Sequence, residues 1–259
     1  PHSYRQTRSD IVAMTRADLV LWHGLYLEAQ LQELLLDLSS RGTVTAVGET
    51  VPPELLIAHE DYQGKFDPHV WMVPELWAHV VTGVRDALAA AAPDHAAAFD
   101  ANAQAHLDRI AQLGRYARDV LMTVPEPSRV LLTAHDAFGY FGRAYGFEVI
   151  GVQGISTESE AGLNRIGTLV DLLVTRDIRA VFVETSVADR NMRALIEGAA
   201  AQGHTVAIGG ELFSDAMGAP DTYEGTYLGM IDHNATTIAS ALGGTAPARG
   251  MDGKLSAGL

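Results

Sequence analysis

The 259-residue chain contains no cysteine. This absence excludes disulfide bridges, thiolate metal sites and cysteine nucleophiles together, so any transition-metal site must use imidazole and carboxylate groups. No apolar run reaches the ~18 residues that a membrane-spanning helix needs. The chain opens with "PHSYRQT" (1–7), which is neither a signal peptide nor a clear strand. We therefore expect it to begin inside a larger folded unit whose opening part precedes residue 1.

Basic residues are also few. Lys and Arg together number 18 against 32 Asp and Glu, which gives a formal net charge of −14. Nucleic-acid phosphates need a basic surface, so no nucleic-acid partner is expected. An acidic surface attracts cations, although acidity alone most often reflects solubility. Four motifs are missing as well: the dinucleotide-binding GxGxxG, the P-loop, the zinc-protease HExxH and the hydrolase GxSxG.

The first half of the chain alternates short apolar runs with helical patterns. Residues 17–22 ("ADLVLW") and 43–48 ("TVTAVG") are typical of buried strands, and the spacing predicts a helix over 27–39 between them.

Two longer helices are predicted next. Proline suits the first turn of a helix over 74–92, and the apolar spacing predicts another over 94–124. At 1.5 Å per residue, the latter would span roughly 45 Å, which is too long for the inside of one small lobe. We therefore interpret it as a spine between two lobes.

The second half repeats a pattern of strand followed by helix. Its four β-rich runs are "RVLLTA", "EVIGVQ", "AVFVET" and "TVAIGG". Strands that alternate with helices form parallel sheets, so we predict a four-stranded α/β lobe. In open sheets of this kind ligands bind beyond the carboxyl ends of the strands.

Four polar residues lie where such a ligand would bind. His135 follows "RVLLTA", Asp215 lies on the loop after "TVAIGG", His69 lies on a first-lobe loop, and His2 precedes a helical stretch. We interpret these four as candidates for one cleft between the lobes. Other histidines are discounted because they fall in helical patterns, in a mobile-looking acidic loop or before a strand: His79, His95, His106, His233, His59 and His204.

Other groups have two interpretations each. His23, at a strand end, is the hardest of the histidines to set aside, although a polar loop residue is the simpler interpretation. Glu184 could orient a ligand histidine or cap the following helix. Glu158 and Glu160 could act as acid and base, but a polar loop that caps the next helix is favoured.

The motifs taken together resemble one family, the zinc- and manganese-binding receptors of ABC importers. The segments are "DPHVW" (67–71), "AHDAFGYFGRAYG" (134–146), "GISTESEAG" (154–162), "VFVETSV" (181–187) and "LFSDAMG" (212–218). "PHSYRQT" is similar to the family's first metal loop, which normally follows an aspartate and an opening βαβ segment. "HGLYLE" (23–28) resembles a motif that usually begins with asparagine, so His23 is a departure and a candidate neighbour of the site.

The resemblance implies an α/β fold of two lobes, each a small parallel sheet flanked by helices. One long spine helix joins them, and the metal lies in the cleft. The implied parts are an N-terminal lobe (1–93), the linking helix (94–124) and a C-terminal lobe (125–259). Carried over by position, the metal ligands are His2, His69, His135 and Asp215. Within "DPHVW", we expect Pro68 to stiffen the loop, Trp71 to pack beneath His69, and Asp67 to orient its ring.

Three imidazoles and one carboxylate suit a borderline divalent cation and disfavour calcium and magnesium. The segment before "DPHVW" lacks the long histidine-rich loop of many zinc-specific members, so Mn²⁺ and Zn²⁺ are both retained. The resemblance further implies a monomeric receptor that delivers metal to the transmembrane subunits of an ABC permease. It would be periplasmic or extracytoplasmic, with a lipid anchor as one form. The alternative is a zinc-dependent hydrolase, but four protein ligands would close the site to water, so we do not expect an enzyme.

Overall fold

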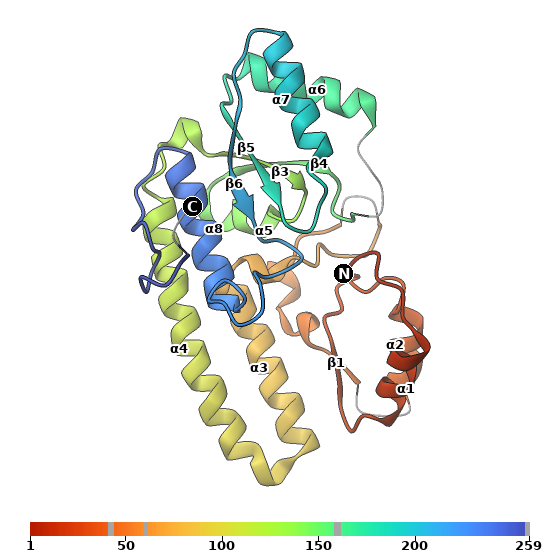
Figure 1. Ribbon diagram of the computed structural model, residues 1–259. Coiled ribbons are helices and arrows are strands. Elements are labelled where there is room, and N and C mark those ends of the chain that lie inside the picture. The colour runs from red at the N-terminus through yellow and green to blue at the C-terminus, as the bar shows by residue number, and fades with distance from the viewer. Residues whose placement is uncertain (41–43, 60–61, 158–161, 257–259) are drawn as a thin grey trace. The chain divides into compact units, whose positions relative to one another are not determined.

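The computed structural model describes residues 1–40, 44–59, 62–157 and 162–256. The chain divides into two compact units, Pro1–Ala111 and Gln112–Leu259. The boundary falls inside one long helix, α4 (Ala96–Leu121). Figure 1 shows the elements of both units along the chain.

The first unit begins with small elements around a two-stranded parallel sheet. They are α1 (Arg8–Arg16), β1 (Val20–Trp22), α2 (Gln32–Ser39) and β2 (Val44–Ala46). Val20 pairs with Val44 and Trp22 with Ala46. The two predicted strands are confirmed, each over three residues.

The helix predicted over 27–39 is wrong in its first part. Residues 24–26 have positive φ values of 78°, 52° and 71°, so the chain makes a left-handed turn directly after β1. The carboxylate of Glu28 accepts hydrogen bonds from the backbone N–H groups of residues 23 and 24 and holds this turn. The α-helix therefore begins only at Gln32.

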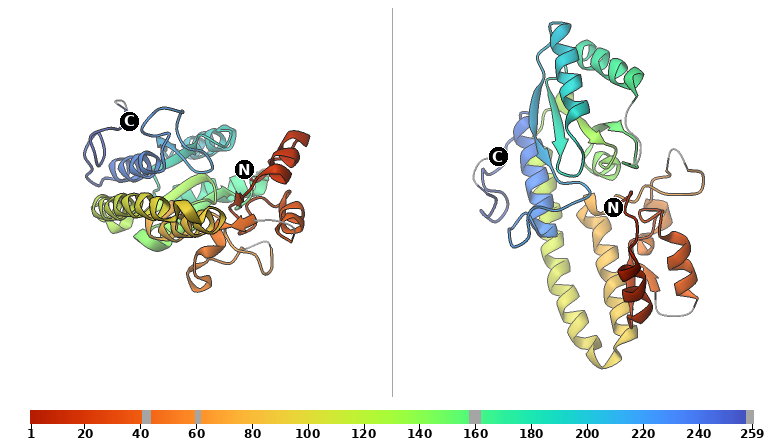
Figure 2. Two further views of the ribbon diagram at one scale, coloured as in Figure 1. Left: turned by 90° about the horizontal axis from the view of Figure 1, so that it is seen from below. Right: turned by 45° about the vertical axis from the view of Figure 1, so that its right-hand side comes forward.

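Two long helices follow, α3 (Pro74–Ala91) and α4, joined by a short 3₁₀ turn at Pro93–His95. Helix α3 and the part of α4 that belongs to the first unit lie side by side and run in opposite directions (Figure 1 and Figure 2). Proline occupies the first turn of α3, where its missing N–H costs no hydrogen bond. Both predicted helices are confirmed, and α4 is slightly shorter than expected at both ends. Within the described residues, no helix combines the length and apolar character needed to cross a membrane.

The second unit is built on a parallel sheet with the strand order β4-β3-β5-β6. The strands are β3 (Val130–His135), β4 (Glu148–Gln153), β5 (Ala180–Glu184) and β6 (Ala207–Leu212). The helices that follow them in turn are α5 (Gly139–Tyr145), α6 (Leu163–Thr175), α7 (Arg190–Ala201) and α8 (Tyr227–Ala241). The predicted four-stranded α/β lobe is confirmed.

The core of this unit lies between the sheet and helices α6 and α7. Leu132 of β3, Leu173 of α6 and Leu195 of α7 are fully buried there. Helix α8 packs closely on β6 at Gly210. A Cβ atom added to this glycine would collide with Thr237 of α8. A residue without a side chain therefore allows this approach.

Candidate metal centre

His69 lies just before a 3₁₀ turn, Val70–Met72, and is fully buried. Its backbone N–H donates to Oδ1 of Asp67 at 2.9 Å, and its Nδ1 lies 2.7 Å from the same oxygen. A carboxylate can only accept, so Nδ1 carries the proton and Nε2 keeps a lone pair for a metal. The expected role of Asp67 is thereby confirmed. The ring of Trp71 lies against that of His69 with centroids 5.0 Å apart, as predicted.

His23 stands behind this loop and is not one of the paired histidines. Its Nε2 lies 2.8 Å from the carbonyl oxygen of Pro68, to which it donates. Its ring contacts Trp71 edge-on and stacks on Trp77. Burial lowers the pKa of His23 to about 4, so the ring is neutral. The interpretation of His23 as a simple polar loop residue is therefore wrong, because it fastens the backbone next to His69.

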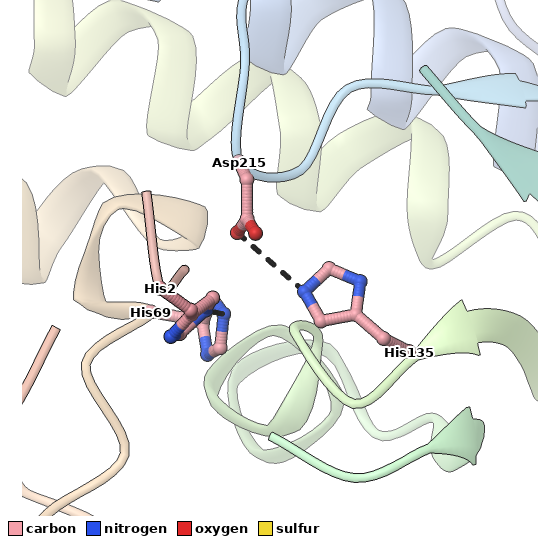
Figure 3. Close-up of side chains that lie close together, drawn as sticks. All are labelled: His2, His69, His135 and Asp215. Atoms are coloured by element: carbon pink, nitrogen blue, oxygen red, sulfur yellow. Dashed lines mark hydrogen bonds and ion pairs between the residues drawn. The ribbon is translucent and has the colours of Figure 1, made fainter. Parts of the chain in front are cut away.

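His2 completes a pair in the first unit. It is 5% exposed, and its Nε2 lies 3.3 Å from Nε2 of His69 (Figure 3). Nδ1 of His69 is bound to Asp67, so the His69 nitrogen that faces Nε2 of His2 is its Nε2.

His135 is the last residue of β3 and is fully buried. Its Nδ1 lies 2.6 Å from Oε2 of Glu184, and its backbone N–H donates to Oε1 at 2.9 Å. Glu184 ends the neighbouring strand β5. The interpretation that Glu184 orients a histidine is confirmed. The capping alternative is wrong, since Asp189 occupies the N-cap of α7.

Asp215 lies on the Nε2 side of this ring. Its Oδ1 is 3.5 Å from Nε2 of His135 (Figure 3). Burial works against a charged imidazole here, but hydrogen bonds and charge from Asp215 and Glu184 outweigh it and raise the pKa of His135 to about 10. Without a metal, the ring is thus an imidazolium between two carboxylates.

The two pairs share one design. In each, a carboxylate binds both the backbone N–H and the Nδ1 of a buried histidine, so that Nε2 is aimed at the second member of the pair. Two ligand atoms on a tetrahedral ion with bonds of about 2.1 Å are separated by about 3.4 Å. The separations of 3.3 Å and 3.5 Å within the pairs match this value. Each pair can therefore supply two neighbouring ligands to a metal.

The remaining candidates lie elsewhere. His79, His106 and His233 are in helices and His95 is in the 3₁₀ turn. His204 contacts the carbonyl of Ile178 ahead of β6, as expected for a residue away from the site. His59 is 7% exposed, and its ring packs edge-on against Tyr62. Glu158 and Glu160 lie outside the described residues.

Comparison with known proteins gives matches over nearly the whole chain. The family model described as "ZnuA: Zinc-uptake complex component A periplasmic" matches residues 1–241. The manganese-binding lipoprotein MntA of Bacillus subtilis is 45% identical over 243 residues, covering 93% of this chain and 79% of MntA. The manganese ABC transporter substrate-binding lipoprotein PsaA of Streptococcus mitis is 27% identical over 248 residues, with 93% and 78% covered.

A solved structure is similar as well. The zinc-binding protein TroA of Treponema pallidum is 43% identical over 242 residues, which cover 93% of this chain and 78% of TroA. The structure of periplasmic TroA superposes with a TM-score of 0.90 over 93% of this chain and 87% of that one. The similarity thus extends to sequence and fold together.

Proposed function

Because the chain belongs to the ZnuA family of periplasmic zinc-uptake components, we propose that it captures a divalent transition-metal ion, Mn²⁺ or Zn²⁺, for an ABC importer. The relatives MntA and TroA are named for binding manganese and zinc, respectively. The family is one of transport receptors, and the zinc-dependent hydrolase gains no support from it. The protein works with the permease and ATPase subunits of such an importer, to which it delivers the metal.

The observation that carries the proposal is that two pairs of candidate ligands are built in the same way. His2 and His69 form one pair, and His135 and Asp215 form the other. We propose that the two pairs bind a single ion as its four protein ligands. Three nitrogen donors and one carboxylate suit Mn²⁺ and Zn²⁺ better than Ca²⁺ or Mg²⁺, which prefer oxygen. The carboxylate also supplies negative charge that partly neutralises the dication.

The finer parts of the proposal concern assembly and place. We propose a monomer with an N-terminal lobe (1–93), a linking helix (94–124) and a C-terminal lobe (125–259). The protein acts on the outer side of the cytoplasmic membrane, in keeping with the periplasmic family and the lipoprotein relatives. A lipid anchor is the form in which it would stay near its permease. Mass spectrometry of the protein from its native membranes would identify the anchor.

Metal binding by the purified protein tests the proposal. The protein is stripped with a chelator, and Mn²⁺ or Zn²⁺ is titrated in competition with a chromogenic chelator. We expect one ion per chain, and loss of affinity in His2→Ala and in His135→Ala, one from each unit. His204→Ala is the matched control, because its ring nitrogens lie near the carbonyl of Ile178 and the carboxylate of Asp177, ahead of β6.

Two outcomes would contradict the proposal. If only one of the two ligand variants loses affinity, the pairs do not share one ion. If the metal-loaded protein turns over substrates in a hydrolase panel, the receptor assignment fails.

A further inference from the structure

The segment that carries Asp215 leaves the sheet two residues before it. The ladder between β5 and β6 ends where Glu184 pairs with Leu212, and the N–H of Thr185 donates to the carbonyl of Leu212 at 3.1 Å. Sheet hydrogen bonds therefore fix the backbone as far as Leu212. The position of Asp215 depends on what holds Phe213 and Ser214.

Phe213 is held from both sides by one side chain, Asn234 of helix α8. The N–H of Phe213 donates to Oδ1 of Asn234 at 2.9 Å, and Nδ2 of Asn234 donates to the carbonyl of Phe213 at 2.7 Å. Asn234 is 2% exposed. A side-chain amide thus makes the pair of bonds that a neighbouring strand would make, one residue beyond the end of the ladder.

Two further contacts support the same segment. Nε2 of His233 donates to the carbonyl of Glu211 at 2.8 Å, and the His233 ring packs against Phe213. Ser214, which is 1% exposed, hydrogen-bonds through Oγ to Ser186 at 2.9 Å. Among the residues that the structure describes, however, only Asn234 binds both backbone groups of a residue between the sheet and Asp215.

We infer that Asn234 is a positioning residue for metal binding, which acts by fixing the backbone two residues ahead of Asp215. The inference rests on the proposed role of Asp215 as a ligand. An amide carries its donor and its acceptor on two separate atoms of one short side chain, so it can bind the carbonyl and the N–H of one residue together. A smaller apolar side chain would leave two partly buried backbone groups without these partners, and the segment would shift to regain them. The carboxylate of Asp215 would then no longer be held at a fixed place against His135.

Helix α8 provides a matched control two residues away. Asp232 is also fully buried and also holds backbone, because it accepts the N–H of Met251 at 2.9 Å. It fastens the C-terminal segment, and it also accepts a hydrogen bond from the hydroxyl of Tyr223, eight residues beyond Asp215, at 3.0 Å. Asn234→Ala and Asp232→Ala therefore remove comparable anchors from one helix, and of the two only Asn234 holds the backbone between β6 and Asp215.

The experiment uses Co²⁺ as the probe, because its visible absorption reports ligand number and geometry. Affinity, the Co²⁺ spectrum and the melting temperature of the metal-free protein are measured for the wild type, Asp215→Asn and the two alanine variants. For Asn234→Ala we expect about 10- to 100-fold weaker binding, as for other residues that orient a ligand, and an altered spectrum. For Asp232→Ala we expect a lower melting temperature with wild-type affinity and spectrum.

The outcomes separate the inference from the proposed function. If the wild type binds no Co²⁺, or if Asp215→Asn binds like the wild type, the proposed site itself fails. If Asp215→Asn loses affinity but Asn234→Ala keeps the wild-type affinity and spectrum, the positioning role is refuted. Equal losses in Asn234→Ala and Asp232→Ala would assign the effect to helix stability and also refute it. Should Asn234→Ala not fold, Asn234→Asp decides, because it keeps the acceptor for the N–H of Phe213 but loses the donor to its carbonyl. Faster Co²⁺ release is expected, and an unchanged rate would contradict the inference.

Discussion

Metal binding should strengthen about 100-fold between about pH 6.5 and about pH 8.5, because a proton and the metal compete for His135. Burial opposes the charged ring, but Asp215 and Glu184 outweigh it and raise its pKa to about 10. The metal-free protein thus carries the extra proton across this whole range. The proton must leave before Nε2 can donate its lone pair, so each pH unit changes the apparent affinity about tenfold.

The size of this competition follows from the same pKa. At about pH 7, a group with a pKa of about 10 is protonated about 1,000-fold more often than not. One pKa unit corresponds to about 1.36 kcal/mol, so the metal displaces the proton at a cost of about 4 kcal/mol. The effect on folding has the opposite sign. A pKa raised above the unfolded value stabilises the metal-free protein below about pH 6.5, and this stabilisation is lost as the pH rises toward 10.

Competition with a chelator at several pH values measures the affinity, and calorimetry in two buffers of different ionisation enthalpy counts the released protons. We expect about one proton per ion above neutral pH. Glu184→Gln is the informative variant, because it removes one of the two carboxylates that raise the pKa of His135 and should flatten the pH dependence. An affinity that stays constant over this range, with no proton released, would refute the reasoning.

Three further changes have defined outcomes. Asp215→Asn keeps the shape of the side chain but removes its charge, so affinity should fall by at least about 10- to 100-fold while the melting temperature of the metal-free protein changes little; unchanged affinity would mean that Asp215 is no ligand. His23→Ala removes the hydrogen bond to Pro68 and should weaken binding about tenfold, measured by chelator competition, whereas wild-type affinity would show that this bond does not position the loop. Gly229→Ala would place a Cβ against the carbonyl of Tyr223 and should lower the free energy of unfolding by about 1–3 kcal/mol, and a urea melt that matches the wild type would contradict the close packing.

The sequence determined the elements whose signals are local. The four strands of the second unit appear as short β-rich runs, and all four form as predicted. Proline at position 74 and a long helical spacing were sufficient to predict α3 and α4. The turn after β1 was missed, because the left-handed φ values of Leu25 and Tyr26 are unusual for these residue types and leave no mark in a hydrophobic pattern.

The predicted strand ends also indicated where candidate ligand residues would lie. His135 ends β3, and strand ends of a parallel sheet are where ligands bind. The strand ends did not predict which residue would lie next to each candidate. His2 and His69 are separated by 67 positions, and Glu184 lies 49 positions beyond His135. These contacts depend on the register of the sheet and on the paths of the loops, which the spacing of residues along the sequence does not determine.

Helix α8 shows this limit most clearly. The segment Asp232 to Thr237 is polar except for Ala235, which is the composition of a solvent-exposed face, and nothing in it distinguishes Asn234. The tertiary structure buries the whole run. One side packs on the glycine-containing strand β6, and on another Asp232 binds the backbone of Met251. Local composition predicts which side chains can form hydrogen bonds, but only the packing of distant segments around the helix decided that Asn234 would make its hydrogen bonds to Phe213 rather than to water.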